Sequence, residues 1–68
     1  MNELHWDSTY EIVKALESAY PEADLELMSL SELCRLVVEL PTFVDDPALA
    51  NDGILKDLLR EWYEERLS

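Results

Sequence analysis

The sequence predicts a mainly α-helical domain: a compact three-helix, winged-helix-like arrangement that leaves room for one short strand pair. Apolar residues recur at helical spacing in three segments, a Ser or Asn stands near the start of each, and prolines follow the first two. We expect residues 1–68 to form a single domain with a thin core, because a chain this short buries only about 60% of the surface that its unfolded form exposes.

The first helix is expected to begin after Ser8 and to end before Pro21. Ser8 and Glu11 form a capping-box pattern, in which each side chain accepts a backbone N–H of the first turn. Trp6, just ahead of this cap, is expected to pack over the helix as a core residue. Four residues are expected to share the apolar face of the helix: Ile12, Leu16, Ala19 and Tyr20.

The second helix is expected to follow a turn over residues 21–26 and a short strand around residues 27–30. Ser31 is predicted to cap it, and Pro41 closes it. Cys34 lies beside its apolar stripe and is expected to pack at the edge of the core rather than to act as a reactive thiol. The stripe itself consists of Leu33, Leu36, Val37 and Leu40.

The connection to the third helix carries two adjacent carboxylates, Asp45 and Asp46, and then a helical turn at 47–50. Because a proline follows the pair directly, we expect an exposed turn that a partner can reach. Asn51 is predicted to cap the third helix. Acidic residues near the end of that helix oppose its dipole, so we expect its last turn to fray. Its predicted apolar face is Ile54, Leu55, Leu58, Leu59 and Trp62.

Charge is the dominant feature of the composition, with 16 acidic residues against five basic ones and a formal net charge of −11. Such a polyanion is repelled by nucleic acids and anionic lipids, so it favours a basic protein or a cation as partner. The alternative that the acidic surface only keeps the protein soluble stays open. Without a signal-peptide pattern or an apolar run near the ~18 residues of a membrane span, we expect a cytoplasmic protein.

Catalytic chemistry finds little support in the sequence. His5 is the only histidine and Cys34 the only cysteine, so a nucleophile–base pair would need these two distant residues to meet. Gly53 is the only glycine, which excludes a glycine-rich phosphate loop. One cysteine cannot hold an iron–sulphur cluster, which takes about four thiolates. We therefore expect no enzymatic activity and no tightly bound cofactor.

A weak metal site is the second chemical possibility. Asp45 and Asp46, joined in space by Glu22 or Asp24, could offer oxygen ligands to a divalent cation. Ferrous iron stands low in the affinity order of divalent metals, so a carboxylate site without histidine should bind it weakly and with little selectivity. A solvated acidic turn without an ion is the alternative.

Residues spread between 4 and 65 carry a family resemblance. They are Leu4, Trp6, Glu11-Ile12, Ala15-Leu16, Ala19-Tyr20-Pro21, Asp24, Leu40, Phe43, Asp45-Asp46-Pro47, Asn51, Ile54-Leu55 and Trp62. In this order and spacing they resemble the IscX family, also called YfhJ, of small acidic proteins encoded with the bacterial iron–sulphur cluster assembly machinery. The chain departs from the pattern at Pro41, Thr42 and Val44, where relatives can carry carboxylates, and these missing ligands argue against iron binding more than against desulfurase binding.

The resemblance implies a winged-helix-like fold and a monomeric, non-enzymatic adaptor or regulator of cluster assembly. Members of the family bind the cysteine desulfurase of the pathway through an acidic surface, and they bind iron weakly. The alternative is therefore a weak ferrous-iron donor or iron sensor, with Asp45 and Asp46 as iron ligands. The candidate residues for desulfurase binding are Glu17, Glu22, Asp24, Asp45 and Asp46.

Overall fold

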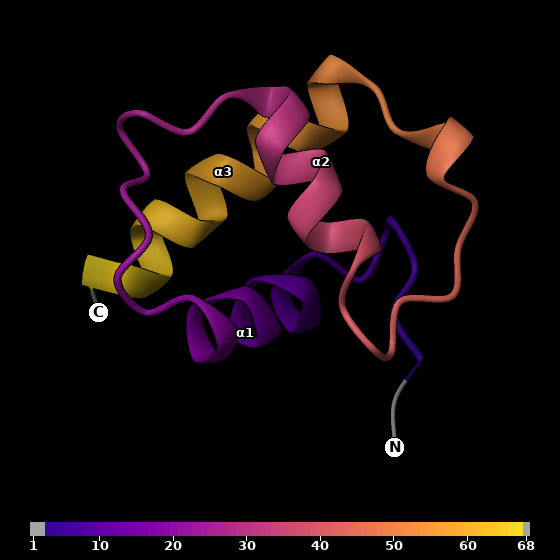
Figure 1. The fold of residues 1–68 in the computed structure, drawn as a ribbon, viewed down its shortest axis with the longest axis horizontal. Coiled ribbons are helices and arrows are strands. Elements are labelled where there is room, and N and C mark those ends of the chain that lie inside the picture. The colour runs from indigo at the N-terminus through magenta and orange to yellow at the C-terminus, as the bar shows by residue number, and fades with distance from the viewer. Residues whose placement is uncertain (1–2, 68) are drawn as a thin grey trace.

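Three α-helices pack around one core in the computed structural model, which describes residues 3–67 (Figure 1). The elements are α1 (Thr9–Ala19), α2 (Leu30–Val38), the short 3-10 helix η1 (Pro47–Leu49) and α3 (Asp52–Leu67). The largest interface between helices joins α1 to α3, and α2 packs against both. The prediction of a mainly α, three-helix fold is confirmed, with residue bounds close to those expected from the sequence.

The predicted strand pair is wrong. Residues 27–29 belong to a loop, and Leu30 already begins α2. Leu27 is 81% exposed, whereas Leu25 is buried, so these two side chains do not share one face as the alternation of a strand requires. Within residues 3–67 there is no strand that could form a wing, and the winged-helix part of the prediction is not confirmed.

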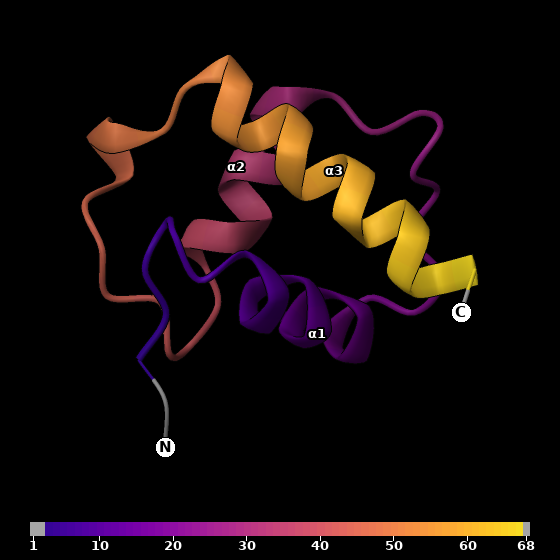
Figure 2. The same ribbon diagram turned by 180° about the vertical axis from the view of Figure 1, so that it is seen from behind.

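One isolated parallel bridge joins the N-terminal segment to the connection after α2. Leu4 pairs with Phe43: the Leu4 amide donates to the Thr42 carbonyl at 2.8 Å, and the Val44 amide donates to the Leu4 carbonyl at 3.0 Å. Figure 2 shows the N-terminal segment running beside this part of the chain. The bridge therefore fixes the start of the long connection that leads to α3.

The helix starts differ from the predicted caps in two cases. Ser29, not Ser31, caps α2, because its Oγ accepts the backbone N–H of Glu32 at 3.1 Å. Ser8 occupies the predicted N-cap position of α1, but its side chain makes no cap hydrogen bond; its Oγ accepts the amide of His5 at 3.4 Å instead. The predicted capping box of Ser8 and Glu11 is therefore wrong.

The third helix follows the prediction at its start and departs from it at its end. Asn51 Oδ1 accepts the amide of Ile54 at 2.9 Å, which confirms the predicted cap. The predicted helical turn after the carboxylate pair is η1. At the other end, α3 stays helical to Leu67 instead of losing its last turn, and Arg66 forms hydrogen bonds with residues of α1 and of the following loop.

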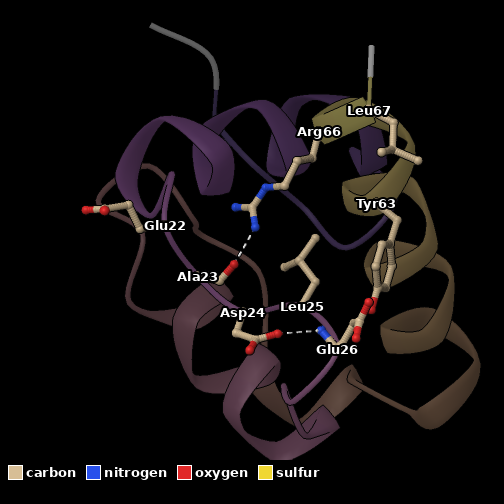
Figure 3. A pocket seen from close by; sticks show the side chains of 8 residues that line it. All are labelled: Glu22, Ala23, Asp24, Leu25, Glu26, Tyr63, Arg66 and Leu67. Atoms are coloured by element: carbon tan, nitrogen blue, oxygen red, sulfur yellow. Dashed lines mark hydrogen bonds between the residues drawn. The ribbon is translucent and has the colours of Figure 1, made fainter.

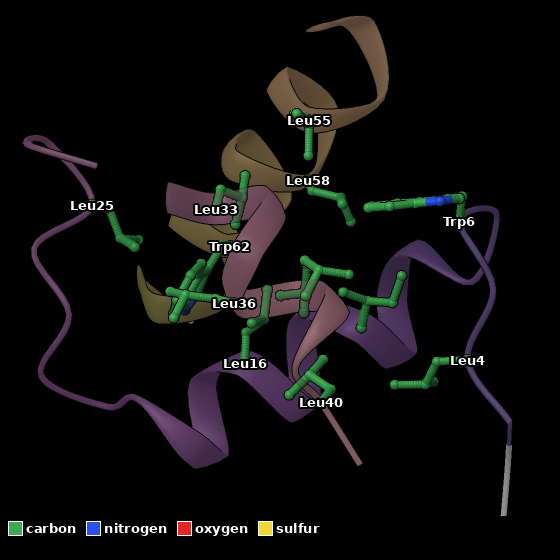
Figure 4. Close-up of a cluster of buried hydrophobic side chains, with 13 residues drawn as sticks. Leu4, Trp6, Leu16, Leu25, Leu33, Leu36, Leu40, Leu55, Leu58 and Trp62 are labelled. Atoms are coloured by element: carbon green, nitrogen blue, oxygen red, sulfur yellow. The ribbon is translucent and has the colours of Figure 1, made fainter. Parts of the chain in front are cut away.

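The core combines leucine, isoleucine and valine side chains of the three helices with leucines of the connecting segments and two tryptophans (Figure 4). Trp62 is fully buried and Trp6 is 6% exposed, so both aromatic predictions are confirmed. The predicted stripe of α2 is buried throughout, and Cys34 is partly buried beside it as expected. In α1, Val13 is buried in place of the predicted Ala19, which is exposed. No helix within residues 3–67 combines the length and apolarity needed to cross a membrane.

Candidate functional site

The five candidate carboxylates lie at two different ends of the molecule. Glu17 stands near the end of α1, and Glu22 and Asp24 follow in the α1–α2 loop, whereas Asp45 and Asp46 lie in the connection before η1. Figures 1 and 2 place this loop and this connection on opposite sides of the helices. The structure therefore does not bring Glu22 or Asp24 to the Asp45-Asp46 pair, and the metal site in which either of them would join that pair does not form.

Asp45 is held by the N-terminal segment. Its Oδ2 accepts the Trp6 backbone amide at 3.0 Å, and its Oδ1 accepts the amide of Asp46 at 2.7 Å. These two hydrogen bonds, and then the nearby His5 imidazole at 3.8 Å, hold the pKa of the Asp45 carboxyl below its ordinary range. The side chain is only 22% exposed. Asp45 therefore uses both oxygens to fix the turn, which leaves it less accessible than the sequence suggested.

Asp46 is more exposed but also has a local role. Its Oδ1 accepts the amide of Ala48 at 2.9 Å and so caps η1, and its carbonyl accepts Trp6 Nε1 at 2.8 Å. The Trp6 ring packs edge-on against Phe43, with 4.8 Å between ring centroids. The buried Trp6 therefore holds the acidic turn in two ways: its backbone amide donates to the Asp45 carboxylate, and its indole N–H donates to the Asp46 carbonyl.

The acidic residues do not converge on a chelating cluster. Within residues 3–67, no group of three His, Cys, Asp or Glu side chains stands close enough together to hold a metal ion. At the Asp45-Asp46 turn, three of the four carboxylate oxygens already accept backbone amides, so a cation would compete with those amides for most of the available ligands. The donor set fits a loosely attracted cation better than a coordinated one.

Glu17 makes hydrogen bonds to α3. One oxygen, Oε1, accepts Trp62 Nε1 at 2.7 Å together with Arg66 Nε at 3.1 Å and Nη2 at 2.9 Å. The hydrogen bond from Trp62, then those from Arg66, and the charge of Arg66 hold the pKa of Glu17 below its ordinary range. Its charge is compensated inside the protein, so Glu17 connects the two longest helices rather than presenting a free carboxylate.

Arg66 also binds the α1–α2 loop. It donates to the carbonyl of Ala23, and its Nη2 donates to the carbonyl of Tyr20 at 3.2 Å. Its guanidinium lies 5.6 Å from the centre of the Trp62 ring. The positive charge of Arg66 is therefore used within the fold and does not neutralise the carboxylates farther along the loop.

A cavity of about 390 Å³ lies between the loop and the end of α3 (Figure 3). Leu25 and Tyr63 line it together with the acidic residues Glu22, Asp24 and Glu26, and Figure 3 shows the Glu22 carboxylate pointing away from it. The Asp24 Oδ1 accepts the Glu26 amide at 3.1 Å, which shapes the loop locally. Burial, and then the charges of Glu26 and Asp24, raise the pKa of the Tyr63 hydroxyl, which Figure 3 shows directed toward Glu26.

The sequence analysis named Glu22 and Asp24 as candidates for partner binding, but it did not name Glu26, Tyr63 or Arg66, which line the same cavity. No local pattern singles out Tyr63 or Arg66, because their contacts are with residues about 40 positions earlier in the chain. The available signal was helical spacing, because Tyr63 and Arg66 each stand four residues after a residue of the predicted apolar face of α3, Leu59 and Trp62.

Two comparisons with known proteins identify the family of the chain. Residues 4–67 match the family model described as iron-sulphur cluster assembly. The chain is also 38% identical over 63 residues to a Pseudomonas aeruginosa protein named only as uncharacterized, in an alignment that covers 93% of this chain and 96% of that protein. The chain therefore belongs to the iron-sulphur cluster assembly family, which is the IscX/YfhJ family that its sequence resembles.

Proposed function

We propose that this protein is an acidic adaptor or regulator of iron–sulphur cluster assembly that binds the cysteine desulfurase of the pathway through its negatively charged surface. The family assignment supplies the pathway. The observation that carries the docking role is the α1–α2 loop, where exposed carboxylates surround an open cavity while the nearby Arg66 is already paired with Glu17. A surface with unpaired carboxylates attracts a basic partner.

A binding titration at two ionic strengths tests the proposal. We expect the protein to bind the desulfurase at about 0.01 M salt, where the Debye length is about 30 Å, and to bind it more weakly at about 0.15 M, where that length is about 8 Å. Absence of binding at the lower salt concentration would refute the docking role. Equal affinity at both concentrations would show that charge does not drive the association.

The two acidic ends can be tested separately. Glu22→Gln at the loop and Asp46→Asn at the turn each remove one charge, and the asparagine oxygen can still accept the Ala48 amide. Because we place docking at the α1–α2 loop, we expect Glu22→Gln to lose more affinity for the desulfurase than Asp46→Asn. These neutral substitutions are preferable to Asp45→Lys, which would remove the acceptor of the Trp6 amide and disturb the fold.

The alternative is a weak ferrous-iron donor or sensor that uses Asp45 and Asp46. Two observations favour it: these two carboxylates are adjacent, and the Asp46 side chain is exposed. An anaerobic ferrous-iron titration followed by NMR tests it. Saturable shifts centred on this turn would support iron binding, whereas equal shifts with calcium would reduce it to general attraction of cations.

We also propose that the protein acts as a cytoplasmic, non-enzymatic monomer. A net charge of −11 on each copy disfavours self-association, which supports the monomer. Light scattering at physiological salt tests this state directly. A stable dimer under those conditions would contradict it.

A further inference from the structure

The cavity between the α1–α2 loop and the end of α3 combines an apolar floor with an acidic rim. Leu25 is 4% exposed and forms part of the floor, and the half-buried Tyr63 ring forms a wall. Asp24 and Glu26 also line the cavity, and Figure 3 shows the Tyr63 hydroxyl directed toward Glu26. Leu67, 84% exposed, extends the apolar surface at the mouth of the cavity.

This combination matches a long side chain that is apolar along its stem and positively charged at its tip. We propose that the cavity receives an arginine side chain of the protein partner. Its methylene stem would lie over Leu25 and Leu67, and its guanidinium would reach the Tyr63 ring and the Asp24 and Glu26 carboxylates. Arginine suits the cavity better than lysine because its planar guanidinium can stack on an aromatic ring and bind carboxylates together.

Charge complementarity excludes anionic occupants of this cavity. Among its lining residues the cation is Arg66, which is paired with Glu17 at 2.9 Å, so the Asp24 and Glu26 carboxylates repel an anion or a nucleic acid. A second copy of this chain carries a net charge of −11 and is disfavoured for the same reason. The acidic rim therefore favours a basic segment of a different protein. The inference rests on the proposed docking function and names the contact at which one basic residue of the partner would be recognised.

A titration of the full chain with N-acetyl-arginine amide, followed by amide NMR shifts, tests the cavity without the desulfurase. We expect saturable shifts over residues 22–26 and 63–67. The probe N-acetyl-citrulline amide has nearly the same shape without the charge, and we expect it to bind about tenfold more weakly. No saturable shift in these residues, or equal binding of the two probes, would overturn the proposal.

Matched variants connect the cavity to the partner. In Asp24→Asn with Glu26→Gln, the asparagine oxygen can still accept the Glu26 amide, and two charges are lost. The control, Glu11→Gln with Asp57→Asn, removes the same charge at exposed positions of α1 and α3 away from the cavity. We expect the cavity pair to weaken binding of both the arginine probe and the desulfurase about tenfold, and the control pair about twofold or less.

The outcomes separate this proposal from the broader one. If the wild-type protein binds the desulfurase and the cavity pair binds it as tightly as the control pair, the docking function stands and the arginine site is wrong. If the arginine probe binds in the cavity and the desulfurase does not bind at all, the site stands and the proposed partner is wrong.

Discussion

Glu17 shows how one side chain can look like a surface charge in the sequence and act as an internal contact in the fold. Its Oε1 accepts three N–H groups from α3, although it was expected to face a partner. Its contact residues lie 45 and 49 positions later in the chain, beyond the reach of any helical periodicity. The sequence could place Glu17 on a helix, and only the packing of α1 on α3 determines its role.

The lowered pKa of Glu17 predicts a pH dependence of stability. Because the folded pKa lies below the unfolded one, the unfolded chain binds more protons, and the stabilisation is complete above the ordinary glutamate pKa of about 4.3. It is lost as pH falls through the lowered folded value. We expect Glu17→Gln to reduce the free energy of unfolding at pH 7 and to differ less from wild type near pH 3.

Urea unfolding followed by tryptophan fluorescence at both pH values measures this effect. Glu22→Gln, in the exposed loop that follows, is the matched control, and we expect it to change stability little at either pH. A constant difference between Glu17→Gln and wild type across this range would show that the charge of Glu17 does not contribute.

Trp6 is the residue that fixes the acidic turn. Its indole N–H donates to the Asp46 carbonyl, and its ring is buried against Phe43. We expect Trp6→Phe to destabilise the protein by about 2 kcal/mol, through the lost hydrogen bond and the smaller ring. Thermal unfolding by circular dichroism measures the loss. Tyr10→Phe, at a 59% exposed position of α1, should change stability by less than about 0.5 kcal/mol.

At the scale of elements, the helices were predictable because the spacing of apolar residues that identifies a helix lies within the helix itself. The spacing of Leu33, Leu36 and Val37 identifies the buried face of α2 without knowledge of its neighbours. The start of α2 was misplaced even though Ser29 and Glu32 form the Ser-x-x-Glu spacing of a helix start. In the sequence, Ser31 is also a possible cap. Only the fold, in which the loop ends at Ser29 and the helix begins at Leu30, shows that Ser29 is the cap.

This difference between the two serines can be measured. We expect Ser29→Ala to destabilise the protein by about 1 kcal/mol, because the Glu32 amide loses its acceptor at the start of α2. Ser31→Ala, in the first turn of the helix, should cost much less because alanine has the higher helix propensity. Chemical denaturation of both variants tests the assignment, and a larger loss for Ser31→Ala would contradict it.

At the scale of the whole molecule, composition predicted the acidic character, and the fold determines where that charge can act. Carboxylates that the sequence presents as one set are divided between two ends. Some are used internally, as Glu17 and Asp45 are, while Glu22 and Asp24 stand at an open cavity. The cavity itself was not predictable, because it forms only where the α1–α2 loop meets the end of α3.

The high net charge also predicts an effect of salt on stability. Repulsion among acidic groups opposes the compact state, and added ions screen it. We expect the melting temperature to rise by a few degrees between about 0.01 M and 0.15 M salt. Sodium chloride and choline chloride should act alike if screening is the cause. A fall in melting temperature would show that the internal ion pairs outweigh the repulsion.

The contacts of α3 have a consequence for synthesis of the protein on the ribosome. Trp62 lies at the centre of the core, and Arg66 connects the last turn of α3 to the loop after α1. When α1 and α2 have left the exit tunnel, their apolar faces still lack the helix that covers them. The native core can therefore close only after residue 66 has emerged, so this protein completes its folding after translation of α3 rather than helix by helix.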